Sequence, residues 1–233
     1  MGAPSALTAA SFLLLVLVML ALATRVVLRA GGAPALGAML LLYLVLPAAL
    51  ARAGLLERYS PLPAPALVLA FGLLVLTAIV ALSPLGRRLA ATTSLAALVG
   101  YQAFRVPVEW LLHRMYLEGF VPVQMTWAGR NSDLITGLTA AVLGLWLGAG
   151  RSVPRWVLLG WNVLGLALLV NIVTVAVLST PVPFRRFTEG PPNLLPSTFP
   201  FVWLPSFLVQ LAGFGHLALF RRLGRRGKVP DGA

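Results

Sequence analysis

Seven long apolar runs constrain this chain more than any other feature of its sequence. A bilayer core of ~30 Å needs about 20 apolar residues as a helix, and each run approaches or exceeds that length. Charged residues, glycines and prolines separate the runs. We therefore expect an all-α integral membrane protein, a bundle of about seven transmembrane helices. The runs cover roughly residues 7–28, 33–53, 63–83, 89–113, 132–149, 155–178 and 198–221.

The composition agrees with a membrane protein and leaves no separate soluble domain. Of the 233 residues, 59% are hydrophobic and only 10% are charged, whereas a soluble domain carries about 25% charged residues. We expect residues 1–223 to form a single polytopic transmembrane domain. A basic cytoplasmic tail follows over residues 224–233.

The basic residues predict the orientation of the bundle. Alternate sides collect 11 and 6 Lys and Arg residues, and the positive-inside rule places the richer side in the cytoplasm. The N-terminus is then outside and the C-terminus cytoplasmic, in a multi-pass protein of a cell membrane such as the bacterial cytoplasmic membrane. The richer side holds Arg25, Arg29, Arg87, Arg88, Arg151, Arg155, Arg221, Arg222, Arg225, Arg226 and Lys228.

The net charge of +12 does not indicate nucleic-acid binding. Most basic residues stand in ones and twos at the ends of apolar runs, where membrane topology places them. The one cluster is the C-terminal group of five between Arg221 and Lys228. We expect this tail to contact anionic lipid head groups.

Several kinds of chemistry are excluded by the residues that the chain lacks. Without cysteine there is no disulfide, thiolate metal site or Cys nucleophile. Lys228 is the only lysine, so no Schiff base forms inside the membrane. His113 and His216 are predicted near opposite ends of their helices, most of a bilayer apart, and cannot ligate one centre. We therefore expect no cofactor and no metal site.

The fourth predicted helix carries a polar stripe. Five of its positions fall within an arc of about 80°, so their side chains project from one face. The stripe begins near the middle of the membrane and runs to the outer surface. Its members are Gln102, Arg105, Glu109, His113 and Tyr116.

Within the stripe, Arg105 and Glu109 are four residues apart and are expected to pair along the helix, where Pro107 should kink it. An unpaired ion in the membrane costs several kcal/mol, so such a pair faces the bundle interior or a wet cavity. It either fixes the packing of the helix or faces a ligand. Glu109 and His113, one turn apart, are also candidates for a general acid and base.

The loop after this helix supplies further polar residues. Asn131 or Ser132 is expected to cap the fifth helix, and Asp133 in its first turn suits the helix dipole. Arg130 is either a contact for a phosphate or carboxylate or a surface charge. All four residues precede or open the apolar run that starts near residue 132.

Two polar residues of later helices extend the candidate site. Asn171 and Gln210 are predicted at the depth of Gln102, where they either enlarge a cavity or join helices by hydrogen bonds. The proline-rich segment 180–196 is either a lid over the stripe or a rigid connector.

Three functions remain open from the sequence. The first is the binding or transport of a small or amphiphilic ligand in an outward-facing site, with Arg105 holding an anionic group and Glu109 a cation or proton. The second is a membrane-embedded enzyme acting on a lipid-like substrate, with Glu109 and His113 as acid–base groups. The third is a non-catalytic assembly or sensory subunit. The sparse set of catalytic side chains favours the first.

Overall fold

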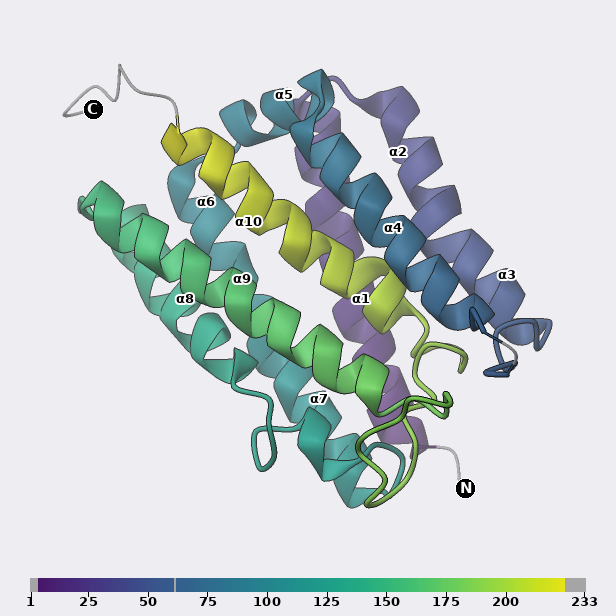
Figure 1. Ribbon diagram of the computed structural model, residues 1–233. Helices are drawn as coiled ribbons and strands as arrows, with labels where there is room; N and C mark the ends of the chain where they lie inside the picture. The colour runs from purple at the N-terminus through teal and green to yellow at the C-terminus, as the bar shows by residue number, and fades with distance from the viewer. Residues whose placement is uncertain (1–3, 61, 225–233) are drawn as a thin grey trace.

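The structure is a computed structural model that describes residues 4–60 and 62–224. The described residues form helices joined by turns and loops, without a β-strand (Figure 1). In chain order the helices are α1 (Ala6–Arg29), α2 (Ala33–Leu40), η1 (Leu41–Val45), α3 (Leu46–Arg52), α4 (Pro65–Leu82), α5 (Pro84–Thr92), α6 (Leu95–Gly100), η2 (Tyr101–Phe104), α7 (Arg105–Leu117), η3 (Val123–Met125), α8 (Asp133–Gly148), α9 (Arg155–Leu178), η4 (Leu204–Leu208) and α10 (Val209–Gly224).

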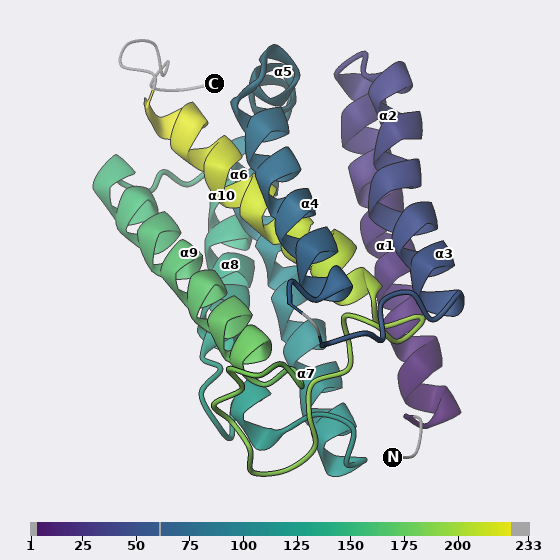
Figure 2. The same cartoon turned by 45° about the vertical axis from the view of Figure 1, so that its right-hand side comes forward.

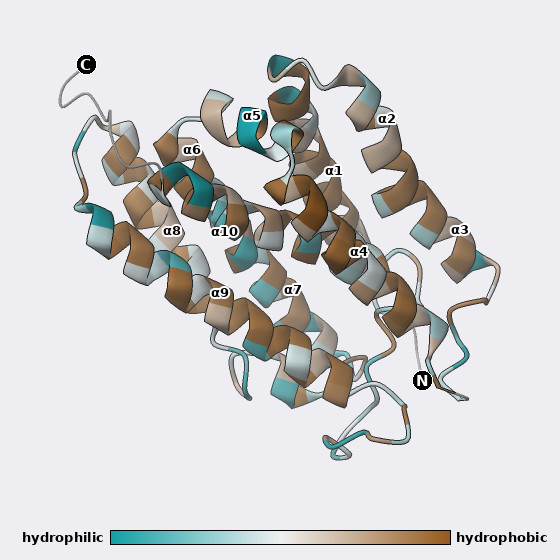
Figure 3. Ribbon diagram, turned by 45° about the horizontal axis from the view of Figure 1, so that its top comes forward, coloured by the Kyte–Doolittle hydropathy of each residue, from teal (hydrophilic) through white to brown (hydrophobic). Residues whose placement is uncertain are grey.

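Several of these elements join end to end into longer helices. The elements α2, η1 and α3 follow one another without a break, as do α6, η2 and α7, and also η4 and α10. Four helices are long and apolar enough to cross a membrane: α1, the α2–α3 helix, α4 and α9. Their outward faces carry exposed leucines and valines (Figure 3), as expected of surfaces that face lipid.

The helix α10 lies at the centre of one face of the bundle. It packs against α4 on one side and against α9 on the other (Figures 1 and 2). Behind it, α6 and α7 pack against α8, and α1 packs against α7. This arrangement surrounds the start of α7 with protein, so polar side chains there are shielded from lipid.

The helices α6 and α8 cross in close contact at two glycines. A Cβ atom built on Gly144 would lie 2.4 Å from the Cα atom of Gly100, a distance that real Cβ atoms do not adopt. Small residues at such crossings allow the two backbones to approach, which is a common means of joining helices in membranes. This crossing holds α8 against the helix that carries the polar stripe.

Two predicted helix boundaries were wrong. The run 89–113 contains a break, because α5 ends at Thr92 and Ser94 starts α6 by accepting a hydrogen bond from the Ala97 N–H. The helix predicted over residues 198–221 begins at Leu204, six residues after the predicted start. Residues 198–203 instead form successive turns around Pro200. Proline has no N–H to donate, which favours turns over a continuing helix at Pro200.

The helix of the polar stripe is not α-helical throughout. Residues Tyr101–Phe104 form a 3₁₀ turn immediately before α7. Pro107 cannot donate a hydrogen bond to the carbonyl of Ala103, four residues earlier, so a change in the helical pattern is expected at this turn.

Two arginines near the C-terminus cap neighbouring helices. The Arg221 guanidinium donates to the carbonyls of Ala81 and Ser83 at the end of α4. Arg222 donates to the Ala90 and Ala91 carbonyls in α5. These two members of the predicted lipid-binding cluster therefore satisfy helix C-termini. The other three, Arg225, Arg226 and Lys228, lie outside the described residues, as does nearly all of the predicted tail.

Glu118 ties the end of α7 to the start of α1. Its carboxylate accepts hydrogen bonds from the Ser5 N–H at 2.9 Å and the Thr8 hydroxyl at 2.7 Å, and it lies 3.3 Å from Arg114. Partial burial raises the pKa of the carboxyl, but the hydrogen bonds and the Arg114 charge together outweigh that effect. The pKa of Glu118 is thus lowered below its ordinary value.

We expect Gly144→Ala to lower the free energy of unfolding by about 1–3 kcal/mol, because the added methyl group overpacks the crossing of α6 and α8. Thermal unfolding in detergent measures the effect. Gly160→Ala is the matched control, since a Cβ atom there meets nothing within 4 Å. Equal unfolding temperatures for the two variants would contradict the close approach.

Acidification should weaken the contact between α1 and α7. Because the folded pKa of Glu118 is lowered, its contribution is present above the unfolded pKa of about 4.3 and is lost as pH falls through the folded value. Glu118→Gln should therefore unfold at a lower temperature than the wild type at pH 7, and the gap should narrow toward pH 3. A gap that does not change with pH would show that the charge of Glu118 is unimportant.

Candidate functional site

The candidate site is built around the buried guanidinium of Arg105. This residue opens α7 and is only 2% exposed. Its Nη1 atom donates to Oδ1 of Asp133, at 2.5 Å, and to the Gly165 carbonyl, at 3.3 Å. Its Nη2 atom lies 3.0 Å from Nε2 of His216. One side chain thus joins α7 to α8, α9 and α10.

The hydrogen bonds of His216 show which of its two ring nitrogens carries the proton. Because Nε2 faces a guanidinium N–H, it must act as the acceptor, and the ring proton is then on Nδ1. Nδ1 lies 2.8 Å from the Oδ1 atom of Asn162, whose amide nitrogen donates to the His216 carbonyl. His216 is therefore a neutral imidazole that orients Arg105.

A glycine makes room for this contact. A Cβ atom on Gly165 would lie 2.6 Å from Cε1 of His216, so a side chain at this position would push the imidazole away from Arg105. The absence of a side chain lets α9 offer its carbonyl to the guanidinium while α10 brings the histidine alongside.

The predicted pair of Arg105 and Glu109 does not form. Arg105 is bound to Asp133, and Glu109 accepts hydrogen bonds from the amide nitrogen of Asn131 at 2.6 and 2.7 Å. The loop between α7 and α8 folds back into the bundle and delivers both partners. A contact from another helix therefore replaced the expected contact along the helix.

Asn131 has a second role at the start of α8. Its Oδ1 atom accepts a hydrogen bond from the Asp133 N–H, at 3.0 Å. Ser132 occupies the N-cap position but makes no side-chain capping bond, so of the two predicted residues it is Asn131, one position earlier, whose side chain bonds to the first turn. The sequence predicted only an interaction of Asp133 with the helix dipole. Asp133 does stand in the first turn of α8, but its carboxylate also pairs with Arg105.

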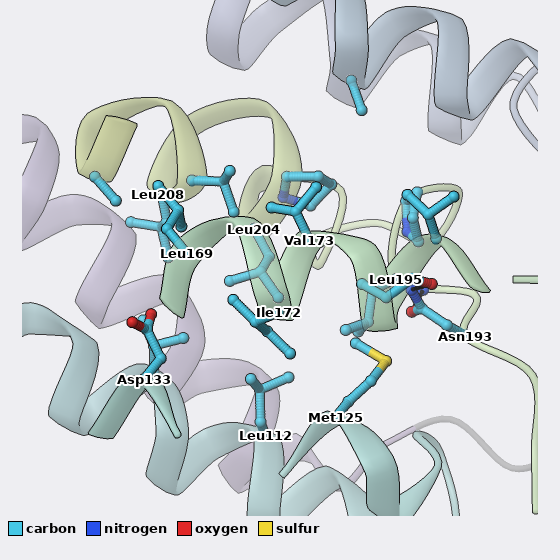
Figure 4. Close-up of a pocket in the computed structure, with 18 of the residues that line it drawn as sticks. Leu112, Met125, Asp133, Leu169, Ile172, Val173, Asn193, Leu195, Leu204 and Leu208 are labelled. Carbon is cyan, nitrogen blue, oxygen red and sulfur yellow. Dashed lines mark hydrogen bonds between the residues drawn. The ribbon is translucent and has the colours of Figure 1, made fainter. Parts of the chain in front are cut away.

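A pocket extends from the surface to this cluster. Its cavity volume is about 100 Å³, and its lining includes the buried side chains of Arg105, Glu109 and Asp133. We call this buried part the inner end of the pocket. Most of the other lining side chains are apolar and come from α4, α9, η4 and α10. Figure 4 shows Asp133 among the lining residues together with Leu169 and Leu208.

A second hollow continues the pocket along the surface between α4 and α9. It has a volume of about 500 Å³, and Gly213 and Leu217 of α10 form part of its lining. The two cavities share Phe71, Leu74, Leu169, Val173 and Val177. Together they form one apolar groove, which we call the α4–α9 groove.

Loop residues close the end of the groove away from α10's C-terminus. Met125 of η3 and the segment containing Asn193, Leu195 and Pro196 line this end (Figure 4). Asn193 is fixed by its own hydrogen bond to the Ala176 carbonyl of α9. The proline-rich segment is thus part of the wall of the pocket.

The structure brings three of the eight predicted site residues to the pocket. Arg105, Glu109 and Gln210 line it. Gln210 is buried, and its Oε1 atom accepts a hydrogen bond from Thr77, whose hydroxyl oxygen lies 3.0 Å from that of Tyr43.

The other five predicted residues lie elsewhere. Gln102 is buried and donates to the Ala212 carbonyl. His113 stacks on Trp127 with ring centroids 4.2 Å apart, and Tyr116 lies beside it at 5.8 Å. Asn171 donates to the backbone carbonyl of Arg130, whose exposed guanidinium lies over Phe187.

Sequence reasoning missed His216 and Asn162 and underestimated Asp133. The estimated depth of His216 was wrong: it contacts Arg105, which precedes His113 by eight residues, or about 12 Å of helix. A signal was available in the last helix, where the polar side chains of Gln210 and His216 interrupt an otherwise apolar run. Within residues 4–60 and 62–224, no three His, Asp or Glu side chains are grouped as metal ligands.

Residues 62–224 match the model of a family described as a domain of unknown function, DUF8737. The match covers more than half of the chain, which therefore belongs to this family. It includes every residue of the site and of the α4–α9 groove, and leaves α1 to α3 outside. No curated protein matches the chain, and no solved structure does.

Asp133→Asn should cost about 3–5 kcal/mol of unfolding free energy, because it leaves the buried Arg105 charge unpaired. Glu109→Gln should cost less than about 1 kcal/mol, since Glu109 pairs with an amide and not with a cation. Chemical denaturation in detergent measures both values.

A double-variant cycle checks the assignment. If Arg105 and Asp133 interact, Arg105→Gln combined with Asp133→Asn costs clearly less than the sum of the two single changes. Additive costs, or a larger loss for Glu109→Gln than for Asp133→Asn, would show that the partner of Arg105 is assigned wrongly.

Proposed function

We propose that this DUF8737 member binds an amphiphilic ligand in the α4–α9 groove, with the polar end of the ligand at Arg105, Glu109 and Asp133. One observation carries the proposal: an almost wholly apolar pocket ends on three buried charged side chains. An amphiphile is the class of molecule whose two ends match these two environments.

The route into the groove supports a ligand that comes from the bilayer. The apolar side chains of Phe71 on α4 and Val170 on α9 are exposed at the groove. Between these two helices, Gly213 and Leu217 of α10 form part of the lining of the groove. A lipid-like molecule therefore reaches the pocket sideways, without crossing water. Transport of such a ligand is an extension of this function.

We further propose that seven helices cross the membrane, with the N-terminus outside. The seven are α1, α2–α3, α4, α6–α7, α8, α9 and η4–α10, and α5 is a short connecting helix. The length of α8 and the charges of α7 are unusual for membrane spans. Their close packing against other helices supports their inclusion.

The geometry favours ligand binding over acid–base catalysis by Glu109 and His113. The His113 ring stacks on Trp127, and its Nδ1 atom is buried without a hydrogen-bond partner. Glu109 bonds to Asn131 instead. A general acid and base need hydrogen-bond reach to a shared substrate, and these two side chains point to different surroundings.

Native mass spectrometry of the detergent-purified protein tests ligand binding. We expect the wild type to retain a specific lipid or other amphiphile, and Val173→Trp to lose it, because the larger side chain fills the groove. Val163→Trp is the matched control, since Val163 lies on the same helix but is 56% exposed and outside the groove.

The retained molecule is identified by extraction and fragmentation. Retention that is the same in wild type and Val173→Trp, or bulk phospholipid alone, would overturn the proposal. The role as an assembly subunit would then be the better explanation of the buried charges.

A further inference from the structure

We infer that the ligand carries a cationic amine head group, which pairs with Glu109 and Asp133 at the inner end of the groove. The inference rests on the proposed function and specifies the chemical class of the ligand. It follows from the charges that the structure places at this end of the pocket, and from the hydrogen bonds that these groups already make.

The negative and positive charges at the inner end of the pocket are unequal in number. Glu109 and Asp133 contribute two carboxyl groups, and Arg105 contributes one cation. His216 adds no charge, because its Nε2 atom accepts from Arg105 and therefore carries no proton. With both carboxyl groups ionised, the cluster has one negative charge in excess, in surroundings where an uncompensated charge is costly.

Among the residues that the structure describes, Glu109 has no counterion. It is 1% exposed, and the salt bridges of the described residues include no cation within 4.0 Å of it. Its carboxylate is held by the Asn131 amide alone, through one nitrogen that lies close to both oxygens. An ammonium group in the pocket would supply the missing charge.

Asp133 offers a second acceptor at the same place. It is 5% exposed, and Arg105 binds its Oδ1 atom. No hydrogen bond of normal geometry reaches Oδ2 from the described residues, although the Thr136 hydroxyl lies near the carboxyl group. The carboxyl group lies in the pocket lining (Figure 4). An ammonium has three N–H donors, enough to bind both carboxylates.

An anionic head group is disfavoured by the same contacts. Arg105 already donates to Asp133, to the Gly165 carbonyl and to His216. The buried Nε atom of Arg105 has no hydrogen-bond partner among the described residues, but a phosphate or carboxylate bound there would stand beside two carboxylates, which repel an anion. The earlier expectation that Arg105 holds an anion is therefore replaced by one in which Arg105 positions Asp133.

Competition among three probes of equal chain length tests the inference. Dodecylammonium, dodecanol and dodecanoate are added in equal amounts to the protein in a non-ionic detergent, and the bound adducts are counted by native mass spectrometry. Adducts retained by Val173→Trp are subtracted as binding to the surface. We expect the wild type to hold about tenfold more dodecylammonium than dodecanol, and less dodecanoate still.

Glu109→Gln should reduce the preference for dodecylammonium over dodecanol at least fivefold, whereas Glu118→Gln, at the surface end of α7, should leave it unchanged. The comparison of probes in the wild type does not need Glu109→Gln, so it remains decisive if that variant does not fold. A wild type that binds the three probes equally, or prefers dodecanoate, would overturn the inference while leaving the proposed function standing. If every adduct of the wild type were also retained by Val173→Trp, both the inference and the proposed function would be overturned.

Discussion

The buried ion pair of Arg105 and Asp133 is the contact on which the packing of this bundle depends. A guanidinium inside a membrane protein is retained only where partners surround it, and here they come from three other helices. Asp133 starts α8, Gly165 is in α9 and His216 is in α10. Moving any one of these helices would leave a charge or an imidazole unsatisfied, so a single side chain fixes the relative positions of four helices.

Much of the fold follows from the apolar runs, whereas the pairing of the buried charged side chains does not. Predicted runs such as 155–178 coincide with helices because hydrophobic length and flanking charge act locally. The spacing of Arg105 and Glu109 is also local information, and it favours a pair along one helix. Asp133 is 28 residues away, and only the folding of the intervening loop brings it to the guanidinium. Sequence spacing carries no information on that fold.

The site was partly predictable for a related reason. Glu109 and Gln210 were recognised because polar side chains within apolar runs are rare. His216 was placed near the inner end of its helix because the run was taken to end at residue 221. The helix begins at Leu204 and continues to Gly224, so its middle lies closer to His216. Errors at both ends of one helix thus changed the predicted depth of this residue.

For the proposed amphiphilic ligand, the open side of the α4–α9 groove would determine whether the concentration in the membrane or in water governs occupancy. A ligand that enters from the acyl-chain region equilibrates with the leaflet, so its mole fraction among lipids, and not its amount in the aqueous phase, sets the fraction bound. Two amphiphiles with equal intrinsic affinity would then occupy the groove in proportion to their partitioning into the membrane. Lengthening an alkyl chain would increase occupancy at a fixed total dose without any new contact with the protein.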